Sequence, residues 1–173
     1  MSNPAFDNSV ALGTVEGKIR EIVLGMGEDI EYRFHNWVQL NEEMDRIMKP
    51  TIVYVLPPSG DFYIDGLRQE IRDFPEAQIG FLCSTEFDFD SDENDAIIEQ
   101  MKRLCFKFIH RLNESGYFVP IEGKLPYQLV YDHLDENVTG VIITLKLEEE
   151  EGVSLCEDDE NGNNEEESTE MKE

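Results

Sequence analysis

The clearest pattern along the chain is a change of hydrophobic period between Gln78 and Leu112. From Ile79 to Phe89 the residues alternate, with Ile79, Phe81, Cys83, Thr85, Phe87 and Phe89 on one side, which predicts a strand with one buried face. Asp90 or Ser91 then suits the N-cap of a long helix, and Gly116 suits its left-handed C-cap. The broad apolar face of this helix is formed by Ile97, Ile98, Met101, Leu104, Cys105, Phe108, Ile109 and Leu112.

Two shorter helices are predicted before this strand–helix unit. Thr14 suits the N-cap of the first, and Gly25 and Gly27 end it. Its apolar side comprises Val15, Ile19, Ile22 and Val23. Asn36 suits the N-cap of the second helix, which Lys49-Pro50 stops. Its apolar side comprises Trp37, Leu40, Met44, Ile47 and Met48. We interpret the single tryptophan as a core or interface anchor in preference to a platform for a ligand.

The remaining apolar runs predict strands. Asp29–Phe34 reads as a short edge strand, and Thr51–Leu56 as a central strand that Pro57–Asp61 ends. Phe62–Phe74 fits either a short irregular helix or a long loop beside the sheet. A hairpin follows, in which Tyr127–Leu134 and Val138–Leu147 flank the turn Asp135-Glu136-Asn137.

The order of these elements is helix, helix, strand, strand, long helix, strand, strand. This order predicts an α+β fold, with a mainly antiparallel sheet packed against helices and one long central helix. We divide the chain into an N-terminal arm (1–13), an α+β domain (14–147) and an acidic C-terminal segment (148–173). The composition of the last segment predicts disorder.

Charge narrows the classes of partner. The formal net charge is -25, and residues 148–173 hold 13 acids and one Lys. The other 147 residues still carry 26 acids against 13 bases. Since phosphate binding needs a basic patch, this balance argues against an extended duplex-binding surface and favours basic partners or a place in an assembly. The chain shows no charged-then-apolar leader and no apolar run of about 18 residues, so we expect neither a secretion signal nor a membrane span.

The acidic turn before the long helix is the sharpest candidate for metal chemistry. Positions one, three, five and twelve of a calcium-loop pattern are Asp88, Asp90, Asp92 and Glu99. Glu93 stands where the loop needs glycine, and Ala96 offers no ligand at position nine. Because the helix also begins inside the pattern, we interpret Asp88–Asp95 as a capped, solvated turn and predict no metal site.

Nucleophilic catalysis has little support. Ser84 and Ser154 lack a glycine elbow. Cys83 would need His110 or His133, and these lie on separate predicted elements. The cysteines form no CxxC pair, so neither zinc nor a disulfide framework is predicted. The Gly60 loop lacks the glycine spacing and the Lys-Ser/Thr of a phosphate loop. We therefore predict no catalytic residue, no cofactor and no enzymatic activity.

The arrangement resembles small head–tail connector, tail-terminator and tail-completion proteins of tailed bacteriophages, and ring proteins in the tails of crAss-like phages. The resemblance covers roughly residues 14–147 as a pattern of elements. It rests on the N-terminal helix, the helix Trp37–Pro50 before strand Thr51–Leu56, the strand end Phe87–Asp90 before a long helix, and the hairpin joining Tyr131-Asp132 to Gly140-Val141.

This resemblance implies a structural virion protein that forms a ring around the DNA channel, with portal or tail proteins as neighbours. Assembly would take place in the host cytoplasm, and sequence-specific nucleic-acid binding and membrane binding are not expected. Two other hypotheses remain. One is an acidic intracellular adaptor or inhibitor of a basic protein, and the other is a hydrolase that uses the Asp88–Asp95 carboxylates with a metal.

Overall fold

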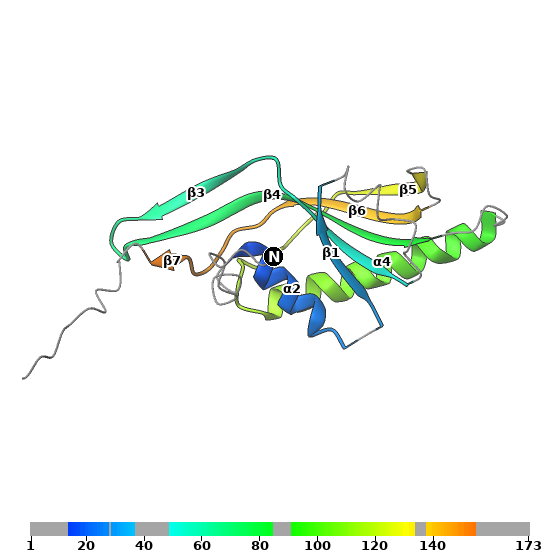
Figure 1. The fold of residues 1–173 in the computed structure, drawn as a ribbon, viewed down its shortest axis with the longest axis horizontal. Coiled ribbons are helices and arrows are strands. Elements are labelled where there is room, and N and C mark those ends of the chain that lie inside the picture. The colour runs from blue at the N-terminus through cyan, green and yellow to red at the C-terminus, as the bar shows by residue number, and fades with distance from the viewer. Residues whose placement is uncertain (1–13, 28, 37–48, 85–90, 134–137, 155–173) are drawn as a thin grey trace, which may run out of the picture.

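The computed structural model describes residues 14–27, 29–36, 49–84, 91–133 and 138–154 (Figure 1). Within these ranges the helices are α2 (Val15–Leu24) and α4 (Ser91–Glu114). The strands are β1 (Glu31–His35), β2 (Thr51–Val55), β3 (Gly60–Asp65), β4 (Glu70–Ser84), β5 (Tyr127–His133), β6 (Val138–Lys146) and β7 (Val153–Ser154). Neither of the helices in the described ranges is long and apolar enough to cross a membrane.

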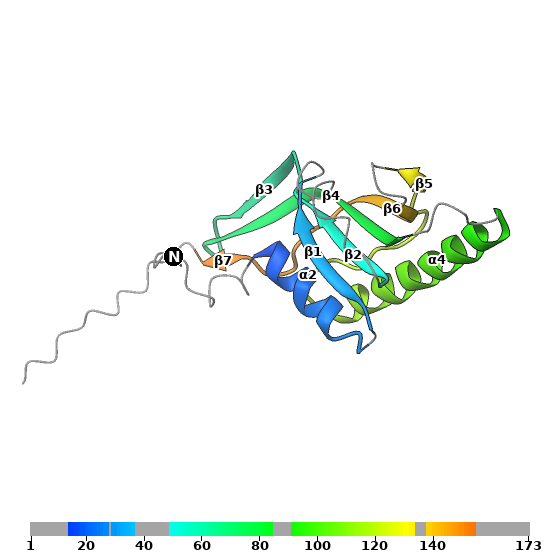
Figure 2. The same cartoon turned by 45° about the vertical axis from the view of Figure 1, so that its right-hand side comes forward.

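The sheet is mixed, in the order β1-β2-β4-β6-β5. β1 runs parallel to β2, while β2–β4, β4–β6 and β6–β5 are antiparallel. The predicted fold class is therefore wrong: the parallel β1–β2 pair makes the sheet mixed, and the fold is not organised around one long central helix. Instead α4 lies beside α2 on one face of a sheet that supplies most of the ordered elements (Figure 2).

β4 organises the sheet because it is longer than any of its partners. Its second half pairs with β2 and β6 in the body of the sheet. Its first half pairs with β3 along one edge and with β7 along the other. We call the three-stranded extension formed by β3, residues 70–75 of β4 and β7 the β-arm. It projects from one end of the long axis, away from β5 (Figure 1).

Pro75 marks the junction between the β-arm and the body of the sheet. Glu76 is the first residue of β4 that pairs with β6, and β7 pairs only with Glu70 and Ile71. Proline lacks an N–H, so it is tolerated in a strand where the ladder is interrupted. The Pro75 carbonyl still accepts a hydrogen bond from the Leu147 N–H, at 3.1 Å.

The core lies between α2, α4 and the sheet face that they cover. Phe81 of β4 and Phe108 of α4 meet edge to face, with ring centroids 5.6 Å apart. The predicted apolar faces of both helices are confirmed, since their central residues are all buried: Val15, Ile19, Ile22 and Val23 in α2, and Ile98, Met101, Leu104, Cys105, Phe108 and Leu112 in α4.

Two predicted helix ends are confirmed. Thr14 is the N-cap of α2, and its Oγ1 accepts a hydrogen bond from the Gly17 N–H at 3.0 Å. Gly116 follows α4 with a φ of 72°, which favours glycine. α4 begins at Ser91, whereas the alternative cap Asp90 lies outside the described residues, as does the predicted helix of Trp37–Met48.

Three predicted strand regions are also confirmed. β1 lies at the edge of the sheet, and every residue of β2 is buried in its interior. β5 and β6 form the predicted hairpin, although its turn residues 135–137 are not among those described. Val141, Ile143 and Leu145 of β6 point into the core as their alternation indicates.

The expected helix or loop at Phe62–Phe74 is wrong, because the segment forms β3, a turn and the first half of β4. Phe62, Ile64, Leu67, Ile71 and Phe74 are spaced by two, three and four residues, which mimics a helical period. When neither face of a strand ribbon is fully buried, apolar and polar residues need not alternate along it. The spacing of apolar residues in this segment therefore does not indicate a strand.

The disorder predicted from Glu148 onward is wrong for residues 148–154. The Val119 N–H donates to the Glu148 carbonyl at 2.8 Å, and the Glu150 N–H donates to the Tyr117 carbonyl at 2.9 Å. Glu149 is buried, and β7 completes the β-arm. Composition alone did not reveal that these acids have partners in the fold. The structure does not describe residues 155–173.

Candidate interaction surfaces

The β-arm exposes apolar side chains in a well-defined geometry. Phe62 is 75% exposed, Ile64 is 65% exposed and Leu67, at the tip, is 98% exposed. Phe62 pairs with Asp73, and Ile64 pairs with Ile71. Directly paired residues share a face of an antiparallel ribbon, so Phe62 and Ile64 lie on the same face as Asp73.

The opposite face and the turn of the β-arm are held by polar and aromatic contacts. Tyr63 stacks on Phe74 with ring centroids 5.9 Å apart, and the Arg72 guanidinium lies 5.5 Å from the Tyr63 ring. Asp65 Oδ1 accepts hydrogen bonds from the Leu67 and Arg68 N–H groups. The bond from Arg68, more than the nearby guanidinium charges, lowers the pKa of Asp65. These contacts fix the turn that presents Leu67.

A buried ion pair fastens the base of the β-arm to the helices. Lys18 Nζ of α2 lies 2.7 Å from Glu149 Oε1, and both side chains are buried. The second oxygen of Glu149 accepts a hydrogen bond from the Asp73 N–H at 2.7 Å. Lys18 also donates to the Glu151 carbonyl at 3.0 Å. Burial, followed by the charge of Glu149, raises the pKa of Asp73.

An apolar groove lies between α4, the segment 121–125 and the β5–β6 hairpin. Its volume is about 530 Å³. The apolar side chains along it include Phe106, Ile109, Leu125, Tyr127, Val141 and Ile143. Phe106 is 69% exposed at its margin. A groove of this size and composition is typical of a binding site for apolar side chains.

Specific contacts position the walls of the groove. The Asn113 side chain of α4 donates to the Ile121 carbonyl at 3.1 Å and accepts from the Ile121 N–H at 2.9 Å. This pair of hydrogen bonds fixes the segment 121–125 against the helix. Lys102 Nζ lies 5.6 Å from the centre of the Tyr127 ring, a cation–π contact that joins α4 to the start of β5.

The groove region is basic in a strongly acidic chain. Residues 102–125 contain five Lys or Arg and only two acids, while the whole chain has 14 Lys or Arg and 39 acids. Of these bases only Lys102 is among the described residues that line the groove, whereas Arg103 and Lys107 line a separate hollow on α4. Since the described lining includes no Asp or Glu, Lys102 favours an acidic group at this margin.

The described catalytic candidates lie in separate surroundings, and the side chain of His133 is not among those that the structure describes. Burial raises the pKa of the half-buried Cys83 thiol, and it raises the pKa of the buried Cys105 to about 12. Both thiols therefore stay protonated and unreactive near neutral pH. His110 is exposed on α4, 3.4 Å from Glu114. Ser154 belongs to β7, where it pairs with Glu70 of β4, away from Ser84 at the other end of that strand.

The calcium-loop residues are only partly described. Asp88 and Asp90 lie outside the described residues. Glu99 is exposed on α4 and bonds to Lys102 at 2.7 Å, which lowers the pKa of Glu99. Within the described ranges, no group of three or more His, Cys, Asp or Glu side chains is placed to hold a metal ion.

Gly60 has a packing role at the base of the β-arm. A Cβ at this position would lie 2.8 Å from Pro75 Cα and 2.9 Å from the Phe74 carbonyl oxygen. The glycine therefore permits close approach of β3 to β4. This packing accounts for a glycine at position 60, so an anion-binding role is not needed to explain it. Trp37, the predicted anchor, lies outside the described residues.

Sequence reasoning missed both interaction surfaces. The alternation of Phe62 and Ile64 before the turn Asp65-Gly66 was a signal for the first strand of the β-arm. The cluster of Lys and Arg in residues 102–125 is no signal for the second surface, since only Lys102 of that cluster is among the described residues that line the groove. The apolar groove depends on contacts between α4 and β6, which no local pattern encodes.

Comparisons with protein-family models, with curated proteins and with solved structures give no match to this chain.

Proposed function

We propose that the protein is a structural subunit that assembles with its own copies into a ring, as small connector and tail proteins of tailed phages do around their DNA channel. The observation that carries this proposal is the β-arm. It places Phe62, Ile64 and Leu67 in solvent, on strands that the rest of the fold holds in place. Clustered exposed apolar side chains of this kind mark protein–protein contact sites.

The construction of the β-arm supports a role at an interface. Its exposed apolar side chains contribute no burial to the core of their own chain. Yet a buried ion pair, Lys18–Glu149, holds its base, and Asp65 fixes its turn. Association would cost less conformational entropy when the contacting strand is already ordered. This arrangement fits a preformed contact element.

The charge of the chain is compatible with a channel lining. Residues 1–147 carry 26 acids against 13 bases. A ring with an acidic inner surface repels phosphate and lets DNA pass without holding it. The resemblance of the element order to connector and tail proteins supports the same proposal, with portal or tail proteins as neighbours in the particle.

A second candidate is an acidic adaptor that binds one basic protein. The observation in its favour is the net charge of -25, of which residues 148–173 contribute a large share. Such a protein would stay small in isolation and form a one-to-one complex with its partner. The ring proposal requires self-association instead, so molecular mass separates the two candidates.

The test is the mass and shape of the purified full chain, by multi-angle light scattering and negative-stain electron microscopy. We expect closed rings, and we expect deletion of Met1–Gly13 to weaken them while circular dichroism stays unchanged. The N-terminal arm would add interface without adding core. A monomer at every concentration, with a one-to-one complex with a soluble basic protein, would overturn the proposal and favour the adaptor.

A further inference from the structure

We propose that the apolar groove between α4 and β5–β6 receives the β-arm of a second copy of this chain. This inference rests on the proposed self-assembly and specifies its interface. The occupant is the β-arm, a strand ribbon with exposed apolar side chains and acidic residues. The receptor is an apolar groove with Lys102 at its margin.

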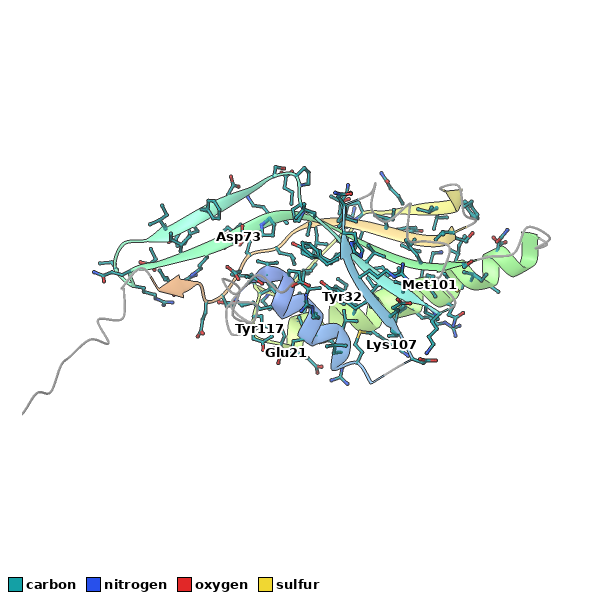
Figure 3. The ribbon with its side chains drawn as sticks, in the orientation of Figure 1. Glu21, Tyr32, Asp73, Met101, Lys107 and Tyr117 are labelled. Carbon is teal, nitrogen blue, oxygen red and sulfur yellow. The ribbon has the colours of Figure 1, made fainter. Side chains whose placement is uncertain are left out.

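The positions of the two surfaces favour contact between different copies. The β-arm occupies one end of the long axis, and β5 lies toward the other end (Figure 1). Figure 3 labels Asp73 on the β-arm and Lys107 on α4, well separated in the view. A groove at one place and a projecting ribbon at another form a heterologous pair, which generates a ring when the rotation closes.

The apolar groups of the two surfaces match. The β-arm offers Phe62, Ile64 and Leu67, and the groove offers an apolar floor with Phe106 and Ile109 on one wall. Docking would remove from water the apolar side chains that each surface now exposes. Aromatic anchors seated in a pocket are the usual centres of binding energy in an interface.

The charges of the two surfaces are complementary. The ribbon of residues 60–75 holds four acids and two Arg, whereas the described residues that line the groove include Lys102 and no Asp or Glu. Arg72 of the ribbon pairs with Glu70, and Asp61 pairs with Lys146. The negative charge that remains suits Lys102, and the exposed apolar side chains distinguish the ribbon from the acidic but polar segments of the chain.

The strand edges give the contact a register. Among the described strands, β3 pairs only with β4, and β5 pairs only with β6. Each therefore has one edge on which described strands leave the backbone groups unpaired. Phe62 and Ile64 share the face of Asp73, and Phe62 and Asp73 line a hollow together with Val15 at the start of α2, on the helix side of the sheet. Placing β3 beside the partner's β5 would aim both side chains toward the groove.

Two variants of the full chain test this directly. One carries Phe62→Thr, Ile64→Thr and Leu67→Ser, which disable the β-arm at exposed positions. The other carries Phe106→Glu, which puts an acid at the margin of the groove. A Leu24→Ser variant is the matched control, since Leu24 is an exposed apolar residue on α2 outside both surfaces. Circular dichroism and urea melts verify that each variant folds.

Light scattering then measures each variant alone and an equal mixture of the first two. We expect the control to assemble like the unaltered chain. We expect each disabled variant to associate at least about tenfold more weakly. The mixture should yield a one-to-one dimer, because one intact β-arm meets one intact groove. That dimer is the specific signature of a head-to-tail contact.

Three results would overturn the inference. Normal rings from both disabled variants would reject this interface while leaving the proposed self-assembly intact. Loss of rings only on removal of residues 155–173 would identify the acidic segment as the occupant. A monomeric unaltered chain, with no dimer in the mixture, would reject both the interface and the ring proposal.

Discussion

The two halves of β4 belong to one strand but have different surroundings. From Gln78 to Leu82 the strand lies between β2 and β6, and most of its residues are buried. From Glu70 to Phe74 it pairs with β3, and with β7 only at Glu70 and Ile71, and its residues are partly covered. The segment 78–82 stabilises the body of the fold, whereas the segment 70–74 supports β3, which presents Phe62 and Ile64 to solvent. A core strand and an interface strand therefore have the same backbone geometry, and the degree of burial of their side chains distinguishes them.

The largest expected effect lies in the body of the sheet. Phe108 is fully buried against Phe81, so Phe108→Ala should cost about 3–5 kcal/mol of unfolding free energy. Phe62→Ala in the β-arm should cost under about 0.5 kcal/mol, because an exposed side chain leaves no cavity. Urea melts of both variants measure the contrast. Equal losses would show that the β-arm packs on its own chain in solution.

The next effect lies where the β-arm joins the body. Ending the chain after Leu147 removes Glu149, its ion pair with Lys18, and the hydrogen bonds of residues 148–151, which together should cost about 3 kcal/mol or more. The matched control ends after Ser154 and keeps the ion pair, so its melting curve should follow that of the full chain. If both truncations melt alike, the Lys18–Glu149 pair does not stabilise the fold.

The smallest effect concerns Asp73 and pH. Because burial and Glu149 raise its pKa in the folded chain, Asp73 binds its proton more tightly when folded than when unfolded. Its contribution to stability is complete below the ordinary pKa of 3.8 and is lost as the pH rises through the raised value. Asp73→Asn should therefore make stability fall less between pH 4 and neutrality. An unchanged pH profile in thermal melts would contradict this.

The elements of the body could be predicted from sequence because burial imposes a period on them. β2, α4 and β6 each bury one face or both, and their apolar residues recur accordingly. Thr14 and Gly116 mark helix ends through backbone chemistry that is local in sequence. These signals do not depend on where the elements pack.

Three features could not be predicted because no burial period or local signal marks them. They are the β-arm, the parallel pairing of β1 and the ordering of residues 148–154. Phe62 and Ile64 are exposed, so no burial pattern distinguishes their strand from a loop. β1 is parallel to β2 through pairing that no local residue encodes. Glu149 looks like any other acid in its run until Lys18, 131 residues away, provides the partner. Long-range contacts of this kind decide both the fold class and the candidate interface.

The central claim is that the exposed apolar side chains of the β-arm, Phe62, Ile64 and Leu67, contribute to assembly and not to stability. The most direct measurement compares the full chain with its Phe62→Thr, Ile64→Thr and Leu67→Ser variant, by sedimentation velocity and by urea melts on the same samples. The account predicts that the two chains unfold within about 1 kcal/mol of each other, since exposed positions contribute little to the core. It also predicts that only the unaltered chain sediments as a ring. A variant that still forms rings, or one that unfolds several kcal/mol more easily, would contradict it.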